Sequence, residues 1–102
     1  MYLFVSEVYP NETAKEVANL YIKAITQYPH NESLAVPIVP VAVRTTLKGI
    51  ECISIYEVKK GKADEAITYV STRLAMFHDI KGYRWTTNLY LNLEEGLKLI
   101  GM

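Results

Sequence analysis

Strand-like segments of this chain carry apolar side chains on both of their faces. In a β-strand, successive side chains point to opposite faces, so alternate residues form two sets. In Leu3–Tyr9, one set contains Val5 and the other contains Phe4, and in Ile50–Val58 apolar residues again occur in both sets. A two-layer domain of 102 residues has helices enough to cover only one sheet face. We therefore expect a second copy of the same sheet to cover the other face, in a homodimer or a higher oligomer.

Length and composition predict one domain, residues 1–102, with a single core. Lysines and arginines number 11 and acidic residues 11, so no overall field draws the chain to nucleic acid or to an anionic membrane. No apolar run approaches the ~20 residues that span a bilayer, and the first residues lack a basic leader. The single cysteine, Cys52, excludes an intrachain disulfide and predicts a buried thiol. We expect a cytoplasmic protein with neither a membrane nor a nucleic-acid partner.

Two segments have the 3.6-residue period of amphipathic helices, and each lies between strand-like segments. The first, about residues 13–28, begins with Thr13 and Glu16, which form a capping-box pattern. The valine-rich segment that follows contains Pro37 and Pro40. Because proline cannot donate to a strand ladder, we expect this segment at a sheet edge or with an irregularity.

The order of the elements predicts the fold class. The predicted elements are strand Leu3–Tyr9, helix Thr13–Tyr28, strands Leu34–Leu47 and Ile50–Val58, helix Lys62–Phe77, strand Tyr83–Leu91 and a short helix capped by Asn92 and Glu95. A βαββαβ order is typical of the ferredoxin-like sandwich, with the spatial strand order 4-1-3-2. We therefore predict an α+β, ferredoxin-like fold with a short C-terminal helix.

The segment Phe77–Tyr83 leaves the second helix and enters the last strand through a glycine and an aromatic residue. In this segment and in its layout the chain resembles the dimeric α/β-barrel superfamily, which includes small cofactor-independent monooxygenases and stress-responsive barrel proteins. The resemblance implies a dimer whose sheets face each other. The haem-degrading branch has an asparagine on the first strand and a tryptophan on a helix, whereas this chain has Ser6 and Glu7 on the first strand and Trp85 in a strand.

Two stretches also resemble the RNA-recognition motif, another ferredoxin-like family. Leu3–Val5 resembles its first-strand signature, and Lys48–Ile55 resembles its third-strand signature without the aromatic residues. Those aromatics stack on the bases. Here Ile50 and Cys52 occupy the stacking positions, beside acidic residues of the same strand. We therefore rank RNA binding third among the candidate functions.

A mixed set of small, aromatic and polar residues is the candidate site. If the predicted strand order holds, we expect one sheet face to carry Phe4, Ser6, Cys52, Ser54 and Tyr56, joined by Ala42 and Arg44. Such a set suits a pocket for a flat, weakly polar or anionic molecule, with ligand contacts from Ser6, Arg44, Ser54 and Tyr56. It suits equally a packed dimer interface with Arg44 paired to a carboxylate such as Glu57. The 8 tyrosines of the chain fit both interpretations.

The histidines do not indicate a metal or a catalytic centre. His78 and Asp79 are candidates for acid–base work, but histidine at a helix end commonly interacts with the last carbonyls. His30 has no second histidine or cysteine at ligand spacing. The sequence therefore predicts no metal site and no cofactor, and it leaves catalytic residues and enzymatic activity open.

The leading hypothesis is a small homodimer that binds a partly apolar organic molecule in a pocket of its sheet. The alternative is a structural or partner-binding assembly module without a ligand. A close-packed interface would favour the second, and an internal cavity lined by Tyr56, Arg44 and Ser54 would favour the first.

Overall fold

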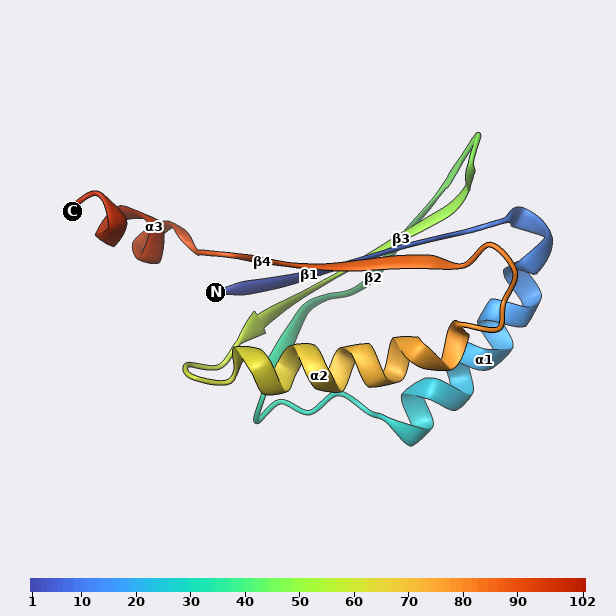
Figure 1. Cartoon of the computed structure of the whole chain (residues 1–102), viewed down its shortest axis with the longest axis horizontal. Helices are drawn as coiled ribbons and strands as arrows, with labels where there is room; N and C mark the ends of the chain where they lie inside the picture. The colour runs from blue at the N-terminus through green and yellow to red at the C-terminus, as the bar shows by residue number, and fades with distance from the viewer.

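A four-stranded antiparallel sheet with two helices on one face forms the body of the protein (Figure 1). The structure, a computed structural model, describes residues 1–102. In chain order the elements are β1 (Tyr2–Tyr9), η1 (Asn11–Thr13), α1 (Ala14–Gln27), β2 (Ala35–Thr46), β3 (Gly49–Val58), α2 (Ala63–Leu74), η2 (Ala75–Phe77), β4 (Arg84–Tyr90) and α3 (Leu93–Leu99). The strand order is β2-β3-β1-β4. The predicted ferredoxin-like α+β fold and its strand order are confirmed.

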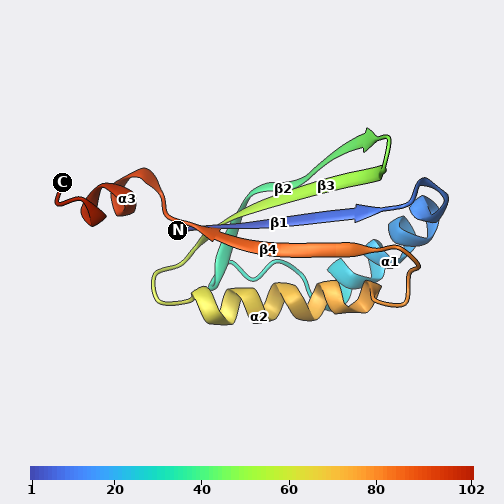
Figure 2. The ribbon, with the colours of Figure 1, turned by 45° about the horizontal axis from the view of Figure 1, so that its top comes forward.

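The strand register assigns each side chain to one of two sheet faces. Val5 of β1 lies opposite Ser54 of β3, and Phe4 lies opposite Ile55. Directly opposed residues of antiparallel strands point to the same face. The helix-covered face therefore carries Val5 with Ser54, and the other face carries Phe4 with Ile55. We call this second side the open face, because α1 and α2 both lie on the opposite side of the sheet (Figure 2).

Two buried clusters form the core between the sheet and the helices. In the first, Leu3 and Val5 pack with apolar residues of β2, β3 and α2. In the second, Val17 and Ala24 of α1 pack near Phe77 at the end of η2. The middle of α1 does not pack closely on the sheet: Tyr21 is 38% exposed and Ile22 is 63% exposed. Space therefore remains between α1 and the sheet.

Strand β2 is an irregular edge strand, as its prolines predict. Its pairing with β3 shifts between Pro37 and Val39 and again between Val39 and Ala42. Within this irregular stretch the Pro40 carbonyl accepts a hydrogen bond of 2.7 Å from the Ser54 hydroxyl. A side chain of the neighbouring strand thus satisfies a carbonyl in the stretch where the pairing shifts.

The two predicted helix caps differ in outcome. The predicted capping box of Thr13 is wrong: a 3₁₀ turn precedes α1, and the Thr13 hydroxyl donates to the Pro10 carbonyl instead. The capping box of Asn92 and Glu95 is present on α3.

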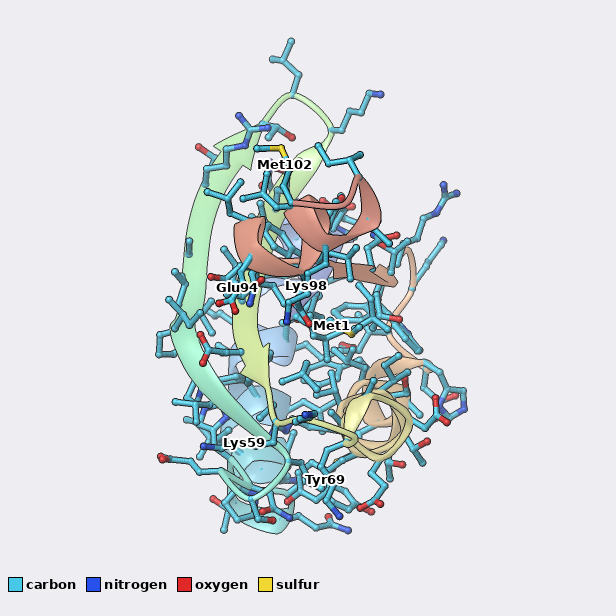
Figure 3. All side chains as sticks on the ribbon, turned by 90° about the vertical axis from the view of Figure 1, so that its left-hand side faces the viewer. Met1, Lys59, Tyr69, Glu94, Lys98 and Met102 are labelled. Carbon is cyan, nitrogen blue, oxygen red and sulfur yellow. The ribbon has the colours of Figure 1, made fainter.

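Helix α3 projects beyond the end of the sheet (Figure 1), with Met1 beside it (Figure 3). None of the helices combines the length and apolar character needed to cross a membrane.

Candidate functional site

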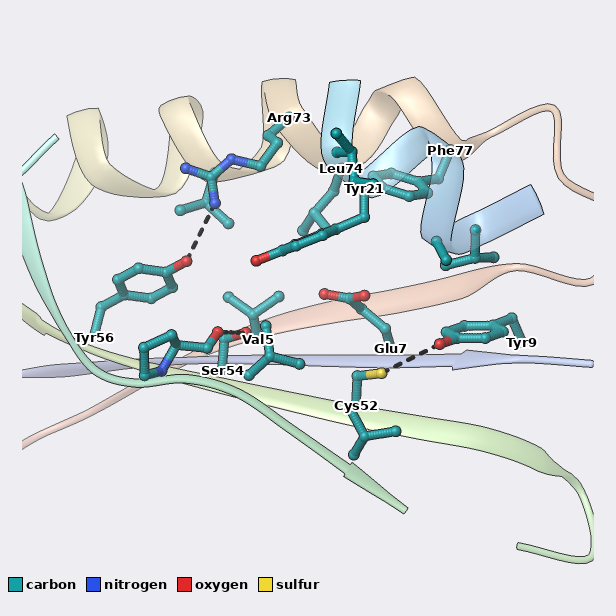
Figure 4. Close-up of a pocket in the computed structure, with 17 residues that line it drawn as sticks. Val5, Glu7, Tyr9, Tyr21, Cys52, Ser54, Tyr56, Arg73, Leu74 and Phe77 are labelled. Atoms are coloured by element: carbon teal, nitrogen blue, oxygen red, sulfur yellow. Dashed lines mark hydrogen bonds between the residues drawn. The ribbon is translucent and has the colours of Figure 1, made fainter. Parts of the chain in front are cut away.

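A pocket of about 520 Å³ lies between α1, α2 and the helix-covered face of the sheet (Figure 4). Of the 17 residues that line it, 13 are hydrophobic, so its walls are mainly apolar. The lining comes from Val5, Glu7 and Tyr9 of β1, Val17, Ala18, Tyr21 and Ile22 of α1, Pro40, Val41 and Val43 of β2, Cys52, Ser54 and Tyr56 of β3, Val70, Arg73 and Leu74 of α2, and Phe77. We call it the sheet–helix pocket.

Small side chains at the middle of β3 help to make this space. Cys52 and Ser54 stand between larger neighbours on the helix-covered face, and both are buried. At the mouth, Ile22 of α1 and Val43 of β2 are 63% and 62% exposed. A helix on one side and an edge strand on the other therefore form two apolar rims. Burying such rims against a ligand would contribute ~25 cal/mol per Å² of apolar surface.

Arg73 is the cation of the pocket, and it is only 7% exposed. Its Nε donates to the Tyr28 carbonyl at 2.9 Å, and its Nη1 donates to the Tyr56 hydroxyl oxygen at 3.2 Å. No carboxylate oxygen lies within 4.0 Å of the guanidinium, as none of the ion pairs involves Arg73. A guanidinium has five N–H donors, and a buried charge without a counterion is costly. The Arg73 guanidinium therefore has N–H donors and a positive charge with which it could bind an anion.

Glu7 is the carboxyl group of the same pocket. One of its oxygens, Oε2, accepts a hydrogen bond of 2.9 Å from the Tyr83 hydroxyl. Burial raises the pKa of Glu7, while the Tyr83 hydrogen bond and the charge of Arg73 act in the opposite direction. Burial and the neighbouring Glu7 also raise the pKa of Tyr83, so this phenol stays protonated. Glu7 forms no ion pair.

Cys52 and Tyr9 form a pair at the sheet end of the pocket. The Tyr9 hydroxyl oxygen lies 3.6 Å from the Cys52 sulfur, and burial raises the pKa of both groups. The prediction that Cys52 is buried is confirmed, at 5% exposure. A thiol with a raised pKa is a poor nucleophile, because the thiolate is the reactive form.

The structure separates the four residues predicted to contact a ligand. Ser54 and Tyr56 line the sheet–helix pocket. Ser6 lies opposite Ile53 on the open face, and Arg44 lies opposite Glu51 on the same open face. The prediction that all four share one face is wrong, because β1 and β3 pair in the register that places Val5, not Ser6, beside Ser54. Ser6 and Arg44 therefore do not line this pocket.

Two further predictions about sheet faces need the same correction. The interface set of Phe4, Ala42, Cys52 and Tyr56 is divided, because only Phe4 and Ala42 lie on the open face. Ile50 and Cys52, the stacking positions of the RNA comparison, face the helices. Within the chain, Arg44 pairs with the carboxylate of Glu51, at 3.0 Å, while the predicted pairing across a dimer with a carboxylate such as Glu57 stays a prediction.

The histidines lie outside the sheet–helix pocket. His78 Nδ1 lies 2.7 Å from the Ala75 carbonyl oxygen, which agrees with the predicted helix-end contact. Its Nε2 also lies 3.2 Å from Asp79, so these neighbours meet although both are highly exposed. His30 packs against the Tyr56 ring, with a buried Nδ1 that has no partner, and burial lowers its pKa. No three His, Cys, Asp or Glu side chains are placed to hold a metal ion.

Sequence reasoning missed the two charged groups of the pocket. Arg73 follows Val70 by three residues on the apolar stripe of α2, and Glu7 stands between Val5 and Tyr9 in the alternation of β1. An ionisable residue at a position that the period assigns to the core is the signal for both. Such residues are rarely buried without a partner, so they mark candidate sites.

Comparisons with known proteins identify no family for this chain. Neither a protein-family model nor a curated protein matches it. Among solved structures, it is similar to a formyltetrahydrofolate deformylase from Pseudomonas putida KT2440, with a TM-score of 0.49 and 1% sequence identity. The similarity covers 87% of this chain and 28% of the deformylase chain. The functional interpretation therefore depends on the side chains of the site itself.

Proposed function

We propose that this protein binds a small, mainly apolar organic acid in the sheet–helix pocket. The observation that carries the proposal is the buried guanidinium of Arg73, which faces an apolar cavity without a carboxylate partner. Pockets for small molecules commonly combine apolar walls with a few polar groups that fix orientation. Here Arg73 and the Tyr56 hydroxyl supply the polar end, and Val5 and Leu74 belong to the apolar wall.

Arg73 also has a structural role, and the proposal accounts for it. Its bonds to Tyr28 and Tyr56 connect the end of α1, the sheet and α2. These two bonds use two of its donors and fix the guanidinium in place before a ligand arrives. A pre-positioned charge loses less entropy on binding than a mobile one. The structural bonds and ligand recognition are therefore compatible.

We also propose that two subunits pair through the open face. Phe4 and Tyr90 meet there edge to face, with ring centroids 4.7 Å apart, and Tyr90 is 52% exposed. Ile53 and Ile55 of β3 are only half-buried on the same face. An extended apolar face of this kind is typical of an interaction surface. It would also serve the second candidate function, an assembly module without a ligand, which the pocket experiment below distinguishes.

The test compares acids with their neutral amides. Isothermal titration calorimetry of phenylacetate and caproate should give affinities ~10-fold or more above those of phenylacetamide and caproamide, since hydrogen bonds to a charged group contribute ~1.5–3 kcal/mol. Arg73→Gln should remove the preference, whereas the matched control Arg44→Gln, on the open face, should keep it. Equal binding of acids and amides, or loss of the preference in both variants, would refute the proposal.

A further inference from the structure

The sheet–helix pocket contains one guanidinium and one carboxyl group that do not contact each other. Arg73 comes from α2 and Glu7 from β1, and both line the cavity. Neither takes part in an ion pair within 4.0 Å. Figure 4 shows Arg73 and Glu7 at separate places on the pocket wall. From this arrangement we infer that the ligand is dipolar: its acid group binds Arg73, and an ammonium group at its other end binds Glu7.

The inference rests on the proposed function and extends it to the substrate class. Opposite charges that served only to neutralise each other in a low-dielectric interior would be expected in direct contact, because separation forfeits the Coulomb energy that offsets their desolvation. Arg73 is buried and Glu7 is partly buried, and both line one cavity without contact between them. A ligand with two opposite charges would satisfy both.

Except for the Tyr21 hydroxyl, which forms no hydrogen bond, the polar groups around Arg73 and Glu7 have partners within the protein. The Ser54 hydroxyl donates to the Pro40 carbonyl, and Tyr9 is paired with Cys52. Tyr83 donates to Oε2 of Glu7, which leaves Oε1 without a protein donor. The only fully buried side-chain polar atom without a hydrogen-bond partner is His30 Nδ1. Oε1 of Glu7 also lacks a protein donor, so it must be accessible from the pocket. Glu7 therefore presents a free acceptor to the pocket.

The mainly apolar lining of the cavity defines the rest of the ligand. Val5, Val70 and Leu74 line the same cavity as the two charges. A ligand that reaches both ends must carry an apolar middle. The class that fits is an amino acid whose ammonium and carboxylate are separated by a hydrocarbon segment, rather than one with both on the same carbon.

A homologous series measures this separation. The probes are γ-aminobutyrate, ε-aminocaproate and ω-aminocaprylate, each compared with the alkanoate of equal length and the corresponding alkylamine by calorimetry on the wild-type protein. At one chain length, the amino acid should bind ~10-fold or more tightly than either comparison compound, as charge-assisted hydrogen bonds are the strong ones. Alkanoates that bind at least as well as amino acids at every length would overturn the inference.

A pair of variants assigns the ammonium contact. Glu7→Gln keeps an acceptor for Tyr83 and should abolish the advantage of the amino acid while alkanoates still bind. The matched control, Glu51→Gln on the open face, should leave the advantage unchanged. If alkanoates bind through Arg73 but Glu7→Gln changes nothing, the dipolar ligand is refuted and the organic-acid proposal stands. If no carboxylate binds the wild type, the proposed function itself fails.

Discussion

Tyr56→Phe removes a single hydroxyl group from the centre of the molecule. The Tyr56 side chain is 4% exposed, and its oxygen accepts the hydrogen bond from Nη1 of Arg73 at 3.2 Å. Hydrogen bonds to charged groups contribute ~1.5–3 kcal/mol to stability. This bond is at the long end of the usual N–H···O range, which places its contribution at the lower end of that interval. We therefore expect the free energy of unfolding to fall by ~1.5 kcal/mol.

Urea unfolding and thermal melting measure this change. For a domain of this size, ~1.5 kcal/mol corresponds to a fall in melting temperature of roughly 6–12 °C. The control is Tyr69→Phe, whose hydroxyl donates to the Pro29 carbonyl at an exposed position while its ring stays under Arg73. The control should lose ~0.5 kcal/mol or less. A Tyr56→Phe protein as stable as the wild type would show that Arg73 does not depend on this acceptor, and it would refute the reasoning.

Three further predictions concern the ionisable pocket wall, the thiol and the open face. The raised pKa of Glu7 means that the folded state binds this proton more tightly than the unfolded state, so its contribution is favourable at low pH and is lost as pH rises from about 4.5 through the folded pKa. Glu7→Gln should therefore gain stability relative to wild type over that interval in urea titrations; a pH-independent difference contradicts the assigned burial. Cys52 should react with a thiol dye only after denaturation, since it is buried, and rapid labelling of the native protein would argue against the core packing described above. Ile55→Asp on the open face should shift the mass seen by light scattering from dimer toward monomer, whereas Leu47→Asp in the exposed turn should not; a wild-type monomer at micromolar concentration would contradict pairing through this face.

The fold was predictable because the hydrophobic period and the residues that begin or interrupt helices and strands agree along the chain. The alternation in β1, the 3.6-residue stripes of α1 and α2 and the prolines of β2 each indicate one local structure, and their order leaves few topologies. The cap of α1 was not predictable in this way. Thr13 has two available partners, and the 3₁₀ turn after Pro10 decides between them.

The candidate site was predictable only in part, for a reason that lies in the sheet. Alternation shows which residues of one strand share a face, but not which set of β1 meets which set of β3. That choice is made by register, and a slip of one residue exchanges the faces. Both sets of β1 are partly apolar, so hydrophobicity did not decide between them. Ser54 and Tyr56 were therefore placed beside Ser6 instead of Val5.

The irregular strand β2 also makes the two edges of the sheet unequal. Pro37 and Pro40 have no N–H group, and two register shifts bend the strand where it lies at the border of the sheet. A strand from another molecule needs a regular row of donors and acceptors to add to an edge, and β2 does not present one. The opposite border, β4, has neither a proline nor a shift in its pairing with β1. We therefore expect backbone pairing between chains, including the pairing that begins aggregation, to occur on the β4 side.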